Sequence, residues 1–397
     1  MGNHMLPNRT EVLIVGAGPT GLALAVSLRQ AGVDHLLIDR LPQGQNTSRA
    51  AVIHAHTLET LEPLGVTEAL IARGLKLRRF AIRDRDHARL QLRFDNLPSS
   101  YPYILMLPQD ETERVLGARL AALGGEVHRG VTATAATQGP AGARVTVASA
   151  EGEQEIEARY VVAGDGMRSL VREAAGIGFD GEPHEGSFVL ADVRMRWALG
   201  RDEVSLFFSP GGMVVVAPLP NGSFRVVAAM EDAPELPGPA DIQALVDARG
   251  PTAGENRVEE VLWSSRFRLH HRIARSYRAG RFLLMGDAAH VHSPAGGQGM
   301  NTGIVDAVVL GRMLAEVVTG NRPDAWLDRY GELRRPAAAE VIALASRLTA
   351  MATTRGAARQ TLRNAMLSLV GALPPARHRV EMSLSGLARR DATRLAA

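Results

Sequence analysis

Apolar and polar positions in the N-terminal part of the chain follow the pattern of a parallel β-α-β unit. Two short apolar runs, 12–15 and 36–39, predict strands that are buried on both faces. The segment between them, 20–31, is apolar and rich in small residues, which predicts a helix that ends at Gly32. This order of strand, helix and strand is typical of a parallel sheet covered by helices.

The middle of the chain changes to the patterns of antiparallel sheet. Residues 80–93 alternate between polar and apolar, as in a β-hairpin, and residues 127–157 indicate a meander that leads into a buried strand over 158–163. Residues 187–230 are almost entirely β-like between glycine-rich turns, which predicts an antiparallel sheet with one covered face. The segment 97–107, rich in proline and aromatic residues, is interpreted as a connection.

Helical patterns dominate the rest of the chain. In chain order, the predicted helices cover 57–64, 110–123, 241–249, 301–319 and about 336–373. A buried strand over 282–285 precedes the last two of them. In the second helix, Asp110 is the expected cap, and Glu113 three residues later completes a capping box.

Composition indicates a soluble globular protein without a nucleic-acid partner. A chain of 397 residues is too long for one ordinary core, so we expect two domains. Lys76 is the sole lysine among 45 basic residues, and the net charge is only +3. The arginines within 78–85 are interleaved with Asp84 and Asp86, so we interpret this cluster as a solvated face.

The absence of cysteine excludes disulfides, thiolate nucleophiles and cysteine-ligated metal sites. No other metal site is predicted. Residues 1–10 lack the apolar core of an export signal, and no apolar run approaches the ~18 residues that cross a bilayer. We therefore expect a cytoplasmic protein without a membrane span.

A glycine-rich turn carries the chemistry of the N-terminal unit. Gly16, Gly18 and Gly21 lie in the string Gly16-Ala17-Gly18-Pro19-Thr20-Gly21, between the first predicted strand and helix. Gly16 permits a tight turn, Gly18 lets the backbone approach a pyrophosphate, and Gly21 lets the helix pack on the strand. The N–H groups at the helix start attract phosphate charge, and Asp39 can accept hydrogen bonds from a ribose. The pattern predicts a dinucleotide site.

Two later segments make this signal more specific. Residues 162–172 contain Asp165-Gly166 after a buried strand, and residues 281–301 contain Gly286-Asp287 after another, followed by a glycine-rich string. In this order and context, the three segments resemble the single-component (group A) FAD-dependent aromatic hydroxylases, whose prototype is p-hydroxybenzoate hydroxylase. The resemblance covers about residues 12–320 and is nearest to hydroxylases of phenols and aromatic polyketides.

The resemblance implies an α/β fold in which a Rossmann-like FAD-binding domain, with a parallel sheet and a β-meander, is interrupted by an antiparallel-sheet substrate domain and followed by C-terminal helices. The implied limits are 6–78, 105–183 and 277–325 for the FAD-binding domain, 79–104 and 184–276 for the substrate domain, and 326–397 for the C-terminal helical segment.

The resemblance also implies which residues contact noncovalently bound FAD. In chain order these are Gly16, Gly18, Pro19, Thr20, Gly21, Asp39, Arg40, Arg49, Gln109, Asp165, Gly166, Gly286, Asp287, Pro294, Gly297, Gly299, Met300 and Asn301. Asp287 would bind a ribityl hydroxyl, and Pro294 would lie near the ring carbon that reacts with oxygen. The start of the helix over 301–319 would stabilise the anionic reduced ring through its N–H groups and its dipole.

Several histidines lie close to these motifs. His292 and Ser293 depart from a family pattern that often has two prolines, and relatives often have arginine at the position of His56. Contacts of His54, His56 and His292 with substrate are left open, and a role bonded to the backbone is the favoured explanation for a histidine at a helix start. His290 is interpreted as a packing residue. We assign no protein nucleophile, because in this family the flavin carries the difficult step.

The implied activity is monooxygenation with NAD(P)H and O2 of a phenolic or polycyclic, polyketide-like aromatic ring, through a flavin C4a-hydroperoxide. A second GxGxxG is absent, so NAD(P)H would dock transiently. The candidate substrate wall consists of Phe207, Phe208, Met213, Val215 and Pro218, of which strand alternation places about half in the core. Substrate identity, regiochemistry, the choice between NADH and NADPH, and the oligomeric state stay open.

Three other functions are consistent with parts of the pattern. A flavin halogenase would need a catalytic lysine and a Trp-x-Trp-x-Ile-Pro motif, but Trp197, Trp263 and Trp326 are isolated. A nicotinamide dehydrogenase would purify without flavin colour. The alternative that the sequence does not exclude is a flavin-binding protein without redox turnover, or one that steers a reactive intermediate.

Overall fold

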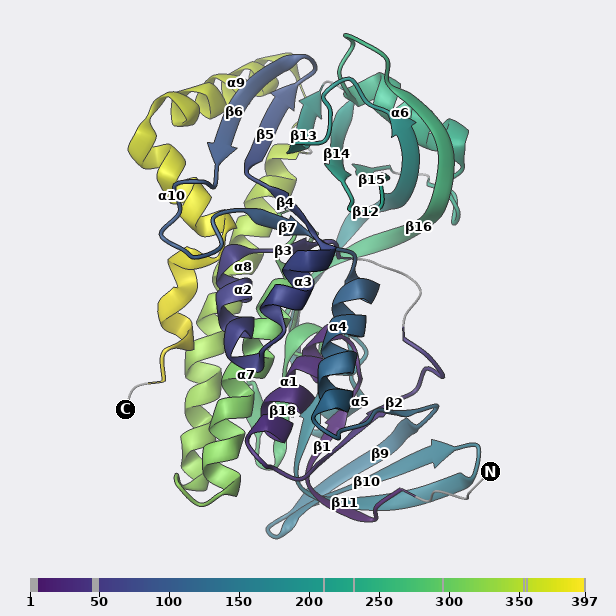
Figure 1. Cartoon of the computed structure of the whole chain (residues 1–397), viewed down its shortest axis with the longest axis vertical. Coiled ribbons are helices and arrows are strands. Elements are labelled where there is room, and N and C mark those ends of the chain that lie inside the picture. Colours follow the sequence, from purple (N-terminus) through teal and green to yellow (C-terminus); the bar gives the residue numbers. More distant parts are fainter. Residues whose placement is uncertain are drawn as a thin grey trace.

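The computed structural model describes residues 6–44, 50–209, 211–230, 233–294, 296–352, 354 and 356–395. Two large sheets lie toward opposite ends of the molecule, and the C-terminal helices run along one side (Figure 1). Within the described part of the chain, no helix combines the length and the apolarity needed to cross a membrane.

The first sheet is built around its central strand β1. In spatial order its strands are β17 (Arg278–Ala279), β18 (Phe282–Leu284), β11 (Gly152–Ala163), β1 (Arg9–Val15), β2 (His35–Asp39) and β8 (His128–Arg129), while β9 (Thr132–Gly139) and β10 (Gly142–Ser149) extend β11 as a meander. Strands β18, β11, β1, β2 and β8 are parallel. Their register aligns Leu284, Ala163, Val15 and Ile38, so the turns that follow these residues begin at one edge of the sheet.

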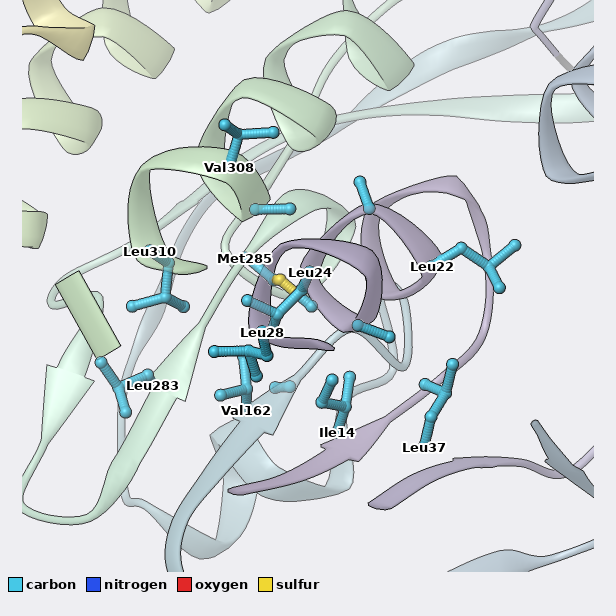
Figure 2. Close-up of a cluster of buried hydrophobic side chains, with 14 of the residues drawn as sticks. Ile14, Leu22, Leu24, Leu28, Leu37, Val162, Leu283, Met285, Val308 and Leu310 are labelled. Atoms are coloured by element: carbon cyan, nitrogen blue, oxygen red, sulfur yellow. The ribbon is translucent and has the colours of Figure 1, made fainter. Parts of the chain in front are cut away.

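Helix α1 (Pro19–Gln30) packs on this sheet and against α4 (Gln109–Ala122) and α7 (Gly299–Val318). Figure 2 shows Leu24 of α1 and Val308 of α7 among the apolar side chains that gather over Ile14 of β1. These side chains are buried, and each contributes about 1.5–3 kcal/mol relative to an exposed position. The cluster therefore fixes where α1 and α7 begin.

The second sheet is antiparallel except for one pair. Its order is β19 (His290–Val291), β16 (Arg257–Ala274), β12 (Phe179–Arg196), β15 (Phe224–Ala229), β14 (Gly212–Pro218), β13 (Glu203–Ser209), β5 (Arg79–Asp84) and β6 (His87–Arg93), with β13 and β5 parallel. Helix α6 (Pro239–Arg249) covers one face through a separate apolar cluster. Strands β12 and β16 pair from Phe179 with Ala274 to Arg196 with Arg257.

A small third sheet and the remaining helices complete the fold. The sheet has the order β3 (Val52–Ile53), β7 (Ile104–Met106) and β4 (Leu75–Leu77). The other helical elements are α2 (Ala55–Leu61), η1 (Glu62–Leu64), α3 (Thr67–Arg73), α5 (Leu170–Ala174), η2 (Gly286–Ala288), η3 (Asp324–Leu327), α8 (Asp328–Ala352), α9 (Ala357–Ala372), α10 (Pro374–Leu384) and η4 (Leu387–Thr393). One apolar cluster joins this small sheet to the inner face of the second sheet and to the C-terminal helices.

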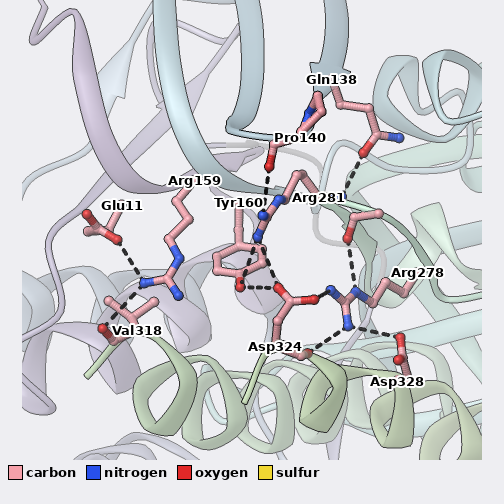
Figure 3. A network of polar contacts seen from close by, with 11 residues as sticks. Glu11, Gln138, Pro140, Arg159, Tyr160, Arg278, Arg281, Val318, Asp324 and Asp328 are labelled. Atoms are coloured by element: carbon pink, nitrogen blue, oxygen red, sulfur yellow. Dashed lines mark hydrogen bonds and ion pairs between the residues drawn. The ribbon is translucent and has the colours of Figure 1, made fainter. Parts of the chain in front are cut away.

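A polar network attaches the C-terminal helices to the first sheet (Figure 3). Asp324 of η3 accepts a hydrogen bond from Tyr160 of β11 at 2.5 Å and pairs with Arg281 at 3.0 Å. Arg278 of β17 pairs with both Asp324 and Asp328, the first residue of α8. The turn between α7 and α8 is thereby held against the sheet.

The predicted α/β architecture is confirmed: a parallel sheet with a meander, an antiparallel sheet and C-terminal helices are all present. The domain limits given above stay predictions. One prediction about element positions was wrong, because residues 97–107 contain β7 and are not only a connection. Residues 257–274, which lie in the predicted antiparallel-sheet domain without a strand assigned to them individually, form the long strand β16.

Two helix predictions were also wrong in detail. Helix α4 begins at Gln109 with Pro108 at its cap, so Asp110 lies in the first turn, and Glu113 accepts a hydrogen bond from Gln109 Nε2 at 2.9 Å. The stretch 336–373 is not one helix, because α8 already begins at Asp328 and ends at Ala352. Helix α9 starts after Gly356, whose φ of +92° is incompatible with a continuous helix.

Candidate active site

The carboxyl edge of the first sheet brings the three motifs together. The N–H of Gly16 donates to the carbonyl of Ile38 at 2.8 Å, and the N–H of Gly164 donates to that of Val15 at 2.8 Å. The N–H of Met285 donates to the carbonyl of Ala163 at 3.0 Å. Since each bond joins the start of one turn to the end of a neighbouring strand, the turns lie side by side, although they are far apart in the sequence.

The glycine-rich turn has the shape that a pyrophosphate requires. Gly16 has a φ of +103°, and a Cβ there would overlap the carbonyl oxygen of Gly164. A Cβ on Gly21 would overlap the carbonyl oxygen of Gly16. A Cβ on Gly18, by contrast, would meet nothing within 4 Å. Gly18 caps α1 and Pro19 is its first residue, so this open space lies at the helix N-terminus, where N–H groups attract anions.

The carboxylate of Asp39 accepts hydrogen bonds from the local backbone. One carboxylate oxygen accepts from the N–H of Ala17 at 2.7 Å and the other from the N–H of Leu41 at 2.8 Å. The contacts fix the loop around the turn and leave each oxygen a further lone pair for a ribose. Arg40 beside it is exposed, and Arg49 lies outside the described residues.

The Asp165-Gly166 turn is directed into the protein. Asp165 Oδ2 accepts from the N–H of Leu170 at 2.9 Å, at the start of α5, and burial raises the pKa of this carboxyl. Gly166 has a φ of +85°. Buried Arg172 donates to the carbonyls of Met167 at 2.9 Å and Ala288 at 3.0 Å, and so ties this turn to the Gly286-Asp287 turn. Sequence reasoning missed Arg172, although an arginine in a short apolar helix was a signal.

The starts of α1 and α7 cross closely at the Gly286-Asp287 turn. Gly286 has a φ of +56°, and a Cβ there would lie 3.0 Å from Thr20 Oγ1. A Cβ on Gly303 would lie 2.6 Å from the same hydroxyl. Three backbones therefore meet around Thr20. The side chain of Asp287 is exposed at this junction.

The start of α7 is held by its own glycines and by Asn301. Gly296 and Gly297 have φ values of +84° and +64°, and a Cβ on Gly297 would lie 3.0 Å from Val52 Cβ. The Asn301 side chain donates to the carbonyls of Val52 at 2.9 Å and Gly297 at 2.7 Å, and accepts from the N–H of His54 at 2.9 Å. Because these bonds occupy its amide, Asn301 can offer a ligand only its backbone.

The first residues of α7, Gly299 and Met300, are half-buried, and N–H groups in the first turn of a helix have no partner within it. Gln109 is the first residue of α4. Its N–H donates to the carbonyl of Ala50 at 3.0 Å and its amide donates to Glu113. Gln109 thus anchors the strand that leads to Val52 and α2.

His54 and His56 are buried at the start of α2. His54 Nε2 lies 2.9 Å from the carbonyl oxygen of Gly296, and burial lowers the pKa of this imidazole to about 4. The N–H of His56 donates to the carbonyl of Ser385 at 3.2 Å, and burial also lowers the pKa of its ring. Both histidines therefore act as neutral groups that join α2 to the loop before α7 and to the C-terminal segment.

A buried ion-pair network lies behind the Gly286-Asp287 turn. Asp306 of α7, with no exposed surface, binds His290 Nε2 at 2.6 Å and Arg334 Nε of α8 at 2.8 Å. Burial acts to raise the pKa of Asp306, but Arg334 and His290 hold it below its ordinary value. Asp306 also accepts from the N–H of Gly286 at 3.3 Å. His290 is therefore part of a polar network as well as packing on Tyr277, and sequence reasoning missed both Asp306 and Arg334.

The turn that carries Pro294 is fixed from both sides. His292 Nδ1 lies 2.8 Å from the carbonyl oxygen of Ser293, and burial lowers the pKa of the ring to about 4. Ser293 Oγ accepts a hydrogen bond from Thr349 of α8 at 3.0 Å. Half-buried Pro294 follows, and its carbonyl accepts from the N–H of Gly297 at 2.9 Å.

Strand alternation divides the predicted substrate wall. Phe208 and Met213 belong to the apolar cluster between the second sheet, the small sheet and the C-terminal helices, and half-buried Val215 packs against it. Phe207 points into the opposite cluster under α6, where its ring meets Trp197 at 5.9 Å. In β14, Pro218 lies four residues after Val214, the cross-strand partner of Phe207, and side chains an even number of residues apart in a strand point to the same face. Pro218 therefore belongs to the face under α6.

Two cavities lie next to the buried histidines. The smaller, of about 20 Å³, is lined by His54, His56, Gln298 and Asn301 among others, and the larger, of about 190 Å³, by His56, Glu59, Arg312 and Arg390 among others. Neither touches the predicted substrate wall. The smaller has room for about one water molecule among polar partners.

The comparisons with known proteins agree with this geometry. The family described as "FAD binding domain" matches residues 9–345. Over 392 residues the chain is 37% identical to 6-methylpretetramide 4-monooxygenase of Streptomyces rimosus, covering 95% of this chain and 69% of the relative. The chain belongs to the FAD-dependent aromatic hydroxylases.

Solved structures of this family have the same fold. p-Nitrophenol 4-monooxygenase of Pseudomonas putida superposes with a TM-score of 0.88 at 25% identity, covering 98% of this chain and all of that one (100%). The Diels-Alderase PyrE3 of pyrroindomycin biosynthesis superposes with a TM-score of 0.80 at 32% identity, covering 96% of this chain and 80% of that one. The fold therefore hosts more than one chemistry.

Proposed function

We propose that this chain hydroxylates a phenolic or polycyclic aromatic substrate with NAD(P)H and O2. The observation that carries the proposal is the arrangement at the carboxyl edge of the first sheet, where the glycine-rich turn at the start of α1, the Gly286-Asp287 turn and the start of α7 meet. When bound, FAD would supply hydride acceptance and oxygen activation.

The protein's part in this chemistry is positioning and electrostatics. The N–H groups at the start of α1 would hold the pyrophosphate, with Thr20 and Gly166 beside it, and the second lone pairs of Asp39 would accept from a ribose. Asp287 would accept from a ribityl hydroxyl. The N–H groups of Gly299, Met300 and Asn301 would stabilise negative charge on the reduced ring without a side-chain cation.

The remaining predicted contacts stay part of the proposal. Gln109 would face the flavin from the start of α4, and Pro294 would lie beside the ring, in a turn fixed by Thr349 and Gly297. Arg40 and Arg49 would reach the phosphate or ribityl region. NAD(P)H would dock transiently.

The substrate would lie between the start of α7 and the inner face of the second sheet. That face presents Phe208, Met213 and Val215, and half-buried Phe267 stacks near Phe188 at 5.8 Å. Leu348 of α8 packs against the same cluster from the other side. An apolar, aromatic-lined wall of this kind favours a flat, largely uncharged ring system.

The similarity to a Diels-Alderase supports a second candidate: a protein that holds FAD and steers a reactive intermediate without redox turnover. Two measurements separate the functions. FAD released from the purified protein and identified by mass shows the cofactor, and NAD(P)H oxidation is then followed with a panel of phenols, naphthols and hydroxyanthraquinones. Hydroxylation predicts faster oxidation with at least one compound and a product that carries an atom of isotope-labelled O2. Bound FAD without acceleration by any compound would favour the second candidate.

A further inference from the structure

Helix α9 exposes a continuous row of large apolar side chains. In the described part of the chain, six large hydrophobic residues are exposed. Three of them lie on this helix, Leu362 (71% exposed), Met366 (49%) and Leu369 (59%), and a fourth, Leu373 (48%), is its C-cap. Their spacing of four, three and four residues places them on one face. We call these four residues the α9 stripe. Figure 1 shows α9 beside β6 at the outer edge of the molecule.

The opposite face of α9 is firmly attached, so the orientation of the α9 stripe is fixed. Buried Arg363 donates to the carbonyl of Phe208 at 2.8 Å, and its guanidinium lies 5.1 Å from the centre of that ring. Asn364 donates to Asp84 at 2.8 Å, and Leu367 is buried in the adjoining apolar cluster. The α9 stripe therefore faces solvent, while the opposite face of the helix packs against the protein.

Most of the charge close to the α9 stripe is positive, apart from Asp84 beside Asn364 and the buried Glu381, which pairs with Arg377. Residues 341–380 contain six arginines and no aspartate or glutamate. Arg359 lies one turn before the stripe, and His378 and Arg379 follow it; all three are exposed. Within the described residues, neither Arg359 nor Arg379 has an ion-pair partner. An apolar row with cations at both ends is complementary to a surface that is apolar below and anionic above.

We propose that the α9 stripe docks this protein on an anionic lipid bilayer. The four apolar side chains would enter the boundary between headgroups and acyl chains, and the flanking arginines would pair with lipid phosphates. A convex row of this kind needs no complementary groove, which suits a bilayer better than a folded partner. The proposal is independent of the hydroxylation reaction and would place the enzyme where apolar aromatic compounds partition.

Charge also argues against a second copy of this chain as the occupant. Antiparallel pairing of two α9 helices about a two-fold axis would bring Arg359 of each copy toward Arg379 of the other. These like charges would repel, whereas Arg377 nearby is already paired with Glu381. Anionic lipid removes this conflict.

The test is flotation of the purified holoprotein with vesicles. Vesicles of phosphatidylglycerol mixed into phosphatidylcholine are compared with phosphatidylcholine alone. Wild type should bind the anionic vesicles at least tenfold more tightly and be released by high salt, which screens surface charge. The double variant L362E/L369E should lose binding at least tenfold, and R359Q/R379Q should lose about fivefold per arginine. L236E, at a leucine that is 77% exposed elsewhere, is the matched control and should bind like wild type.

Circular dichroism and the melting temperature establish that each variant is folded. Equal binding of wild type to anionic and neutral vesicles, or full binding by the folded L362E/L369E variant, would overturn the proposal. A wild-type mass of twice the monomer in light scattering that L362E/L369E reduces to the monomer, without vesicle binding, would assign the stripe to self-association instead and likewise overturn it. None of these results bears on NAD(P)H oxidation, so the proposed function stands or falls separately.

Discussion

Two glycines three residues apart should respond in opposite ways to the same methyl group. At Gly18, φ is −74° and ψ is −175°, which alanine readily adopts, and a Cβ would meet nothing within 4 Å. At Gly21, a Cβ would overlap the carbonyl oxygen of Gly16, which belongs to a backbone fixed by the sheet. Gly18→Ala should therefore affect the ligand, and Gly21→Ala should affect the fold.

The magnitudes separate the two variants. Replacing the helix cap Gly18 by alanine lowers the free energy of unfolding by up to about 1 kcal/mol. Alanine also reduces the conformational entropy of the unfolded chain, which raises the free energy of unfolding by about 0.4–1 kcal/mol. The two effects offset each other, so the apoprotein should stay within about 1 kcal/mol of wild type. Gly21→Ala must displace backbone and should cost at least the roughly 1–3 kcal/mol of ordinary overpacking. For FAD, the new methyl group at Gly18 fills the space that a phosphate would take. Loss of one charge-assisted hydrogen bond, about 1.5–3 kcal/mol, corresponds to roughly 10- to 150-fold weaker binding.

The assay has two parts on the same preparations. Urea unfolding of the apoproteins gives the free energies of unfolding, and quenching of FAD fluorescence gives the Kd. Wild-type FAD affinity in Gly18→Ala would refute the phosphate site at the start of α1. Equal destabilisation by Gly18→Ala and Gly21→Ala would refute the inference that a Cβ has room at Gly18 but not at Gly21.

Three further changes test other parts of the site. Arg334→Leu leaves the fully buried Asp306 without its cationic partner and should lower the free energy of unfolding by about 3–5 kcal/mol in urea, whereas Arg334→Lys should recover part of the loss. Asp287→Ala, at an exposed position, should purify with less FAD but melt within a few degrees of wild type; full flavin content would contradict its assignment. The folded-state pKa values of His54 and His292 are lowered to about 4, against about 6.5 in unfolded chains, so the unfolded state binds more protons between these values. The stability that depends on neutral histidines should be fully present above about pH 6.5 and should fall toward pH 4 by up to about 1.4 kcal/mol per pH unit for each histidine. Urea unfolding at a series of pH values measures this fall, which should be shallower in the double variant H54N/H292N.

The sequence predicted those features that depend on local pattern. The strands at 12–15 and 36–39 are buried, so their residues are apolar except Asp39 at the end of the second strand, and backbone contacts require glycine at Gly16 and Gly21. The three motif turns could be assigned to one place because parallel strands end at one edge of a sheet. Their amino-acid identity therefore carried both the fold and the site.

What the sequence did not predict depends on distant partners. Strand β16 mixes arginine, glutamate and histidine with apolar residues, since Val258, Phe267 and Ala274 pack in three different apolar clusters, so no single period runs through it. The break between α8 and α9 lies in a segment whose alanine-rich composition is helical on both sides. Asp306 and Arg334 are 28 residues apart on two helices, and only their packing shows that they form one ion pair.

The pairing of β12 with β16 also has a consequence for how the chain folds. Ala163 of β11 and Leu284 of β18 are paired in the first sheet, yet about 120 residues separate them. Once Phe179 has paired with Ala274, the open loop between the two strands shrinks to about 20 residues. By the logarithmic cost of loop closure, this shortening lowers the entropic penalty of adding β18 by about 1.5 kcal/mol. Pairing of β12 with β16 would thus bring β18 close to β11. We expect β18, the last parallel strand of the first sheet, to join that sheet only after β12 and β16 have paired.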